Sequence, residues 1–331
     1  MKKALSLILI FYVQLTMAQV MIQKSDSKKM KAFLNSKTLF VLTGDKDFDE
    51  KLKNSVSKYW KVTPFDFIAA NERKQYEKDE KYSFLTMNEF KGTSQDFYRQ
   101  EFLHRSAAES FETNSQNIYT LIGGGSSLDK YNIESWQIGY GTMDLSSKLL
   151  DIKYRIEYLI KGLNDGVEIL KNNAIKGNED KVAETVFDKF SSNAKVLKSK
   201  VLLVDSEYTV DNTKVKGYKS NLLSGKIPGK MVDLDDLKKN GINYEVMPHN
   251  RVMELVSGDN SNYCYLCPTN RSCFKTGSNS GVRSMNMNGM MMGGPWFIFD
   301  LETKNIVFAY LNEHAPVFDK KAVEKLSLAV R

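Results

Sequence analysis

The order of predicted strands and helices, which occurs twice along the chain, constrains the fold more than any other feature of the sequence. In the first half, apolar and aromatic runs predict strands at 37–43, 59–68, 81–87 and 117–125, and an acid-led apolar repeat predicts a helix near 45–60. The second half repeats the order: a strand at 200–205, a helix at 233–241, a strand interrupted by a proline at 243–252, a strand at 261–267 and two strands within 295–311. When the segments 59–68 and 243–252 are aligned, Pro64 and Pro248 fall at matching positions. We therefore expect an α/β (α+β) fold of two similar strand-helix-strand modules with mixed sheets.

A helical pair is expected to join the two modules. Apolar residues from Leu149 to Leu170 recur every three or four positions, which predicts one long amphipathic helix. A second stripe from Val182 to Leu197 predicts a matching helix after the break at 176–180. The pair would pack between the modules, or each helix would cover its own sheet. The expected domains are residues 19–143, the helical pair 144–199, and residues 200–331.

The first eighteen residues have the pattern of a secretory signal peptide. Lys2 and Lys3 precede a short apolar run, and Ala18 offers a small residue at a cleavage point. Residues 1–18 are therefore expected to be removed during export. Nothing later is apolar for long enough to span a membrane, so we expect a periplasmic or outer-membrane-associated protein without a transmembrane segment. The net charge of +7 is scattered, and nucleic acid is not an expected partner.

All three cysteines lie within residues 264–273. If the segment at 261–267 is a strand, Cys264 and Cys267 point to opposite faces of its sheet, which suits neither a mutual disulfide nor a shared metal. Turn residues follow the second cysteine, whereas a thioredoxin-like motif would open a helix there. In an exported protein a structural disulfide is the simplest use, between Cys273 and Cys267, with Cys264 as the other possible partner.

The segment 277–295 is rich in methionine, glycine and asparagine and has no hydrophobic period, so we expect a long loop. Thiolate and thioether sulfurs are ligands that suit Cu(I). A copper site would use the three cysteines with Met290 and Met292. In the alternative, adaptable methionines contact a protein partner, and the candidate contacts are Met287, Met290, Met291 and Trp296.

Other motifs do not assemble into a catalytic set. Gly123–Gly125 follow a strand, but another strand follows them, so a hairpin is favoured over a phosphate loop. His104, His249 and His314 are far apart in sequence and show no metal-binding spacing. The sequence lacks a G-x-S-x-G nucleophile motif.

These observations favour an exported cell-envelope module that binds or assembles with an envelope protein, without catalytic activity, cofactor or membrane span. Peripheral association with the outer membrane would fit this function. The alternative is a copper-binding or thiol-redox protein that uses Cys264, Cys267, Cys273 and the methionine-rich segment. A hydrolase whose residues meet only in the folded chain is a third possibility.

Overall fold

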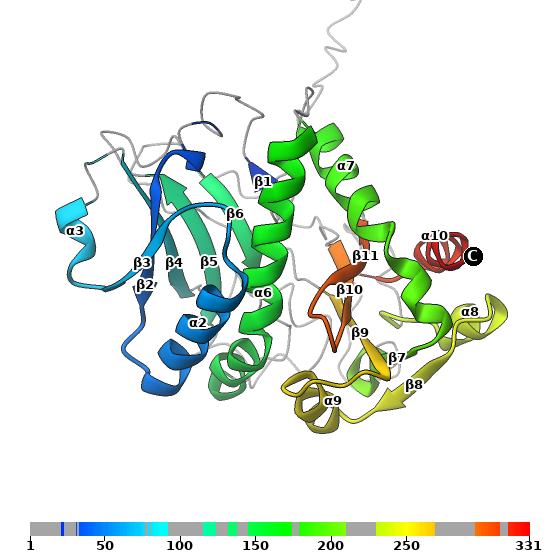
Figure 1. Ribbon diagram of the computed structural model, residues 1–331. Coiled ribbons are helices and arrows are strands. Elements are labelled where there is room, and N and C mark those ends of the chain that lie inside the picture. Colours follow the sequence, from blue (N-terminus) through cyan, green and yellow to red (C-terminus); the bar gives the residue numbers. More distant parts are fainter. Residues whose placement is uncertain are drawn as a thin grey trace, which may run out of the picture.

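The computed structural model describes much of the chain. The described residues are 21–22, 31, 33–76, 79, 81–91, 115–123, 132–137, 145–173, 179–209, 230–268, 295–311 and 317–331. They form helices and two separate sheets, which confirms the expected mixture of α and β structure (Figure 1).

The first sheet has six strands in the order β1-β6-β5-β4-β2-β3. Strand β2 pairs in parallel with both β3 and β4, whereas β4, β5, β6 and β1 pair antiparallel in succession. The strands are β1 (Met21–Ile22), β2 (Lys37–Leu42), β3 (Phe65–Ala69), β4 (Tyr82–Lys91), β5 (Ser115–Gly123) and β6 (Asn132–Gln137). Helices α2 (Lys46–Tyr59) and α3 (Arg73–Tyr76) connect the parallel strands.

The second sheet has five strands in the order β11-β10-β9-β7-β8. Here β7 pairs in parallel with β8 and β9, and β9, β10 and β11 pair antiparallel. The strands are β7 (Val201–Asp205), β8 (Tyr244–Met247), β9 (Tyr263–Pro268), β10 (Pro295–Asp300) and β11 (Ile306–Leu311). Helices α8 (Leu234–Lys239), α9 (His249–Val256) and α10 (Lys320–Val330) and the 3-10 turns η3 (Ala194–Lys198) and η4 (Ser206–Thr209) accompany this sheet.

Helix α6 (Leu145–Asn173) lies between the two sheets, and α7 (Glu179–Ser191) follows it against the second sheet (Figure 1). One buried cluster runs from Phe40 in the first sheet through Leu159 and Leu163 of α6 to Leu203 and Phe297 in the second. The opposite face of the second sheet packs in a separate cluster under α8, α10 and η3. Burial of apolar surface on both sides of α6 therefore unites the sheets around one core.

Short polar signals set the ends of several helices. The Asp45 carboxylate accepts a hydrogen bond from the Phe48 N–H and caps α2, and Asp233 and Asp319 cap α8 and α10 in the same way. Gly241 adopts φ +71° directly after α8, a conformation that glycine enters at little cost.

Two details of the expected repeat were wrong. Pro64 precedes strand β3, whereas Pro248 follows strand β8, so the two prolines do not occupy equivalent places. The segment that follows Pro248 was expected to continue as a strand but forms helix α9. Helix α10 was not predicted from the sequence. An apolar stripe only two turns long fits a helix or a short strand equally well, and tertiary packing decides between them.

Candidate functional site

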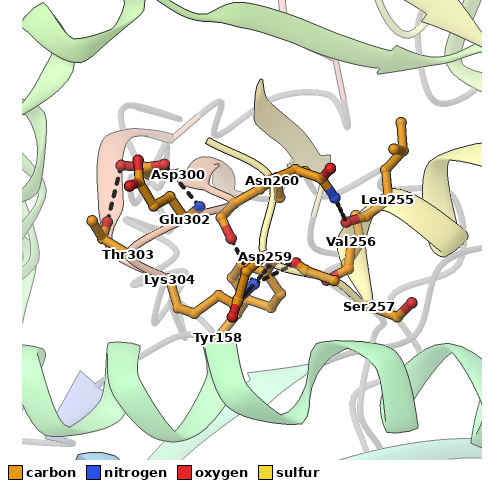
Figure 2. A network of polar contacts seen from close by, with 12 residues as sticks. Tyr158, Leu255, Val256, Ser257, Asp259, Asn260, Asp300, Glu302, Thr303 and Lys304 are labelled. Atoms are coloured by element: carbon orange, nitrogen blue, oxygen red, sulfur yellow. Dashed lines mark hydrogen bonds and ion pairs between the residues drawn. The ribbon is translucent and has the colours of Figure 1, made fainter. Parts of the chain in front are cut away.

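The side-chain ammonium of Lys304 is the centre of a buried polar network at the junction between α6 and the second sheet (Figure 2). Its Nζ donates to the Leu301 carbonyl at 2.6 Å and to the Gly258 carbonyl at 2.7 Å, and lies 3.3 Å from the Tyr158 hydroxyl. Asp259, whose side chain is 75% exposed, pairs with the same nitrogen at 3.0 Å. Three segments distant in sequence are thereby joined at one cation.

Tyr158 supplies the contribution of α6 to this network. Its hydroxyl donates to the Val256 carbonyl at 2.9 Å, and the Lys304 ammonium lies 5.1 Å from the centre of its ring. Burial raises the pKa of the Tyr158 phenol far above its ordinary value, so the hydroxyl stays protonated and remains a donor. The Lys304 hydrogen bond is also the main reason that the pKa of Asp259 is lowered.

A second buried lysine lies at the start of β7. Lys200 Nζ is 2.6 Å from Asp300 Oδ1 and 2.9 Å from Glu302 Oε2. Asp300 also accepts from the Glu302 N–H and the Thr303 hydroxyl, so its carboxylate orders the β10–β11 turn that carries Lys304 (Figure 2). Pairing and hydrogen bonding together offset the cost of burying these charges.

On the face of the second sheet that packs against α6, Arg155 of that helix reaches strand β9. Its Nη2 donates to the Tyr265 hydroxyl at 2.9 Å and contacts Met253 Sδ at 3.6 Å, and the guanidinium lies over the Tyr265 ring. The Tyr265 and Tyr208 hydroxyls are 3.0 Å apart. Burial raises the pKa of Tyr265 well above its ordinary value. Arg155 and Lys304 thus connect α6 to two different parts of the sheet.

Asp205 and His249 meet at the carboxyl end of β7. Asp205 Oδ2 lies 2.6 Å from His249 Nδ1, with the carboxylate fully buried and the imidazole 22% exposed. Ligands of open α/β sheets commonly bind at this edge. A buried carboxylate fixes the orientation of the ring, and here it also attaches the first residue of α9 to β7.

The two described cysteines lie on opposite faces of strand β9, as the alternation of a strand requires. Cys267 is in the cluster that contains α6, and Cys264 is in the cluster under α8 and α10. Burial raises the pKa of the Cys264 thiol to about 12, and the neighbouring Asp300 carboxylate acts in the same direction. A thiol that stays protonated is a poor nucleophile and a poor metal ligand.

The residues proposed for metal or partner binding are not assembled in the described part of the chain. Cys273, Met287, Met290, Met291 and Met292 lie outside it, as do the proposed Cys267–Cys273 disulfide, Gly124, Gly125, His104 and His314. Gly123 ends strand β5. Among the described residues, no three His, Cys, Asp or Glu side chains surround a point suited to a metal ion. Trp296, expected to contact a partner, is only 1% exposed and packs against Tyr208 and Phe318.

The sequence patterns missed the polar residues that matter most at this junction. Lys304 looks like an ordinary turn lysine, and Arg155 looks like a polar residue beside an apolar stripe. For His249 the sequence offers one weak signal, which is its position directly after a strand and a proline. Arg155 and Tyr265 are 110 residues apart in sequence, Lys304 and Tyr158 are 146 apart, and His249 and Asp205 are 44 apart. Local sequence patterns do not encode contacts over such separations.

Comparisons with known proteins give no relative: no family model, curated protein or solved structure matches this chain. In the parts that the structure describes, none of the helices is both long enough and apolar enough to cross a membrane.

Proposed function

We propose that the chain is an exported cell-envelope protein that acts as a non-catalytic binding or assembly module, in the periplasm or at the outer membrane after cleavage of residues 1–18. The observation that carries this proposal is the junction at α6, where one apolar core packs both sheets against the same helix and two buried cations join that helix to the second sheet. Hydrogen bonds between buried polar groups make a core more rigid, which suits a scaffold.

We further propose that the scaffold consists of two copies of one module. In each, a central strand pairs in parallel with the next two strands of the chain, and two antiparallel strands follow. The order β3-β2-β4-β5-β6 thus corresponds to β8-β7-β9-β10-β11, and α2, α3 and α6 correspond to α8, α9 and α10. Binding residues are found disproportionately on loops that a rigid scaffold positions.

The methionine-rich segment is the first candidate for such a surface. Strands β9 and β10 pair with Trp296 opposite Pro268, so residues 269–294 connect the two strand ends on the edge where Asp205 and His249 meet. Met287, Met290 and Met291 within it would offer adaptable thioether contacts to an envelope partner.

A pull-down from detergent-treated envelopes tests the function. The bait is the full-length chain with a C-terminal tag, and the matched control has Met287, Met290 and Met291 replaced by serine. We expect a partner that the wild-type chain retains and the serine variant loses. Recovery of the bait alone, under conditions in which it remains folded, would contradict an assembly function.

The copper-binding or thiol-redox alternative makes different demands. Cys264 and Cys267 face opposite sides of the sheet, so a copper site would have to use Cys273 and the methionines with one of them at most. Elemental analysis of protein from its native compartment, with thiol counting before and after reduction, tests this alternative. One copper per chain would support it, whereas no copper and two blocked thiols would leave a structural disulfide.

A further inference from the structure

The outer edges of the two sheets differ in how their backbone groups are occupied. Strand β11 is covered by α7, where the Ser191 hydroxyl bonds to both the N–H and the carbonyl of Ala309. Strands β3 and β8 are the edges next to the central parallel strands, and each pairs with a single strand among the described residues. Unpaired groups on such edges can template another strand.

The register identifies which groups of β8 point outward. The Leu202 N–H donates to the Asn243 carbonyl, and Leu202 lies opposite Tyr244. In a parallel ladder the bonded residues then alternate, so Glu245 and Met247 bond to β7. The N–H and carbonyl groups of Tyr244 and Val246 therefore face away from the sheet.

Strand β3 shows the same register, but two of its outward donors are occupied. The Thr38 N–H donates to the Pro64 carbonyl and Thr38 lies opposite Phe65, which places Phe65, Phe67 and Ala69 in outward positions. The Phe67 N–H donates to Asp66 Oδ1 at 2.9 Å, and the Ala69 N–H donates to Glu72 Oε2 at 2.7 Å. Carboxylates thus occupy these two donors, and charged side chains are a common protection of natural edge strands.

The carboxylate that corresponds to Asp66 is used differently on β8. Glu245 precedes Val246 as Asp66 precedes Phe67, but its Oε2 accepts from the Tyr263 hydroxyl at 3.3 Å on the neighbouring sheet face. Tyr244, Val246 and Met247 are partly exposed, and Glu245 is exposed. In the described part of the chain, the outward groups of β8 are therefore accessible and are not capped.

We propose that β8 is a docking edge to which an extended segment of a partner protein adds as a further strand. The partner strand would present a basic side chain beside Glu245, with apolar side chains on either side of it next to Tyr244 and Val246. Backbone hydrogen bonds would supply affinity and the alternating side chains specificity. A second copy of this chain fits less well, because two-fold pairing centred on Glu245 would oppose two carboxylates.

A synthetic peptide of alternating lysine and valine, acetylated and amidated, tests the edge directly, without a natural partner. We expect the Tyr244 and Val246 amides to exchange with solvent faster than those of Phe67 and Ala69, and to become protected when the peptide binds. A peptide with glutamate in place of lysine should bind at least about tenfold more weakly. A backbone N-methylated lysine peptide keeps the charge but cannot complete the ladder, so its equal binding would refute strand addition.

Variants of the chain provide a second arm. Val246→Pro removes an outward N–H that does not bond to β7. Glu245→Asp supplies a shorter carboxylate, of the length with which Asp66 caps the Phe67 N–H, so that it can cap the Val246 N–H. Each variant should weaken peptide binding at least about tenfold without a lower thermal midpoint. Undiminished binding to both variants would overturn the proposal. The inference rests on the proposed binding function, yet the two can fail separately. A natural partner captured equally by Val246→Pro would leave the function intact and exclude this edge.

Discussion

Replacing Lys304 by methionine should destabilise the protein strongly although the residue lies in a turn. Methionine keeps most of the apolar stem but removes the ammonium, so the Leu301 and Gly258 carbonyls lose donors at 2.6 and 2.7 Å inside the junction. A buried polar group left without its partner costs about 1–3 kcal/mol. Two such groups, less the gain from no longer burying a charge, give an expected loss of about 2–4 kcal/mol.

Urea unfolding followed by tryptophan fluorescence measures this loss. With a slope near 3 kcal/mol per molar urea, the midpoint should fall by about 1 M. The matched control is Asp259→Asn, which removes the exposed partner of the same ammonium and should change stability by no more than about 0.5 kcal/mol. A Lys304→Met variant as stable as the wild type would show that the ammonium does not hold α6 to the second sheet.

Three further predictions follow from described contacts. Thr38→Val breaks a buried hydroxyl chain in which Thr38 Oγ1 lies 2.6 Å from Thr63 Oγ1 and 2.9 Å from Ser83 Oγ, and should cost about 1–3 kcal/mol in the same urea assay; a smaller loss would mean that water replaces the chain. Cys264 should resist a thiol reagent at pH 8 in the folded protein and react after unfolding, because its pKa is raised to about 12; rapid labelling of the native chain would contradict this. The pKa of Asp259 is lowered from 3.8 in the folded protein, so its stabilising contribution should be present above pH 3.8 and lost as the pH falls through the folded-state pKa. Asp259→Asn should remove this contribution from a titration of stability with acid. An acid profile of stability that the substitution leaves unchanged would refute the prediction.

Strong periodicity made most elements of the fold predictable. The long apolar stripe after Leu149 gave α6 nearly to its ends, and the β-branched runs gave β2, β7 and β10. Short segments were less predictable: Pro248 ended a strand and opened α9, where the sequence suggested a continuing strand. Local preference is weak over so few residues, and packing against α6 decides the outcome.

The candidate site was largely beyond prediction. Strand alternation correctly separated Cys264 and Cys267, because the side-chain period of two is a local property. Trp296 was a candidate partner contact and is buried, since an aromatic residue in an apolar strand gives no sign of which face is covered.

For the long periodic segments, the sequence by itself determined whether a strand or a helix forms and which side chains share a face, because both depend on neighbours along the chain. Tertiary structure alone decided that Arg155 and Lys304 meet the tyrosines of other elements, and that among the described residues Glu245 bonds to Tyr263 and does not cap the Val246 N–H. These outcomes depend on the relative placement of elements that are distant in sequence, which the packing of α6 between the sheets establishes.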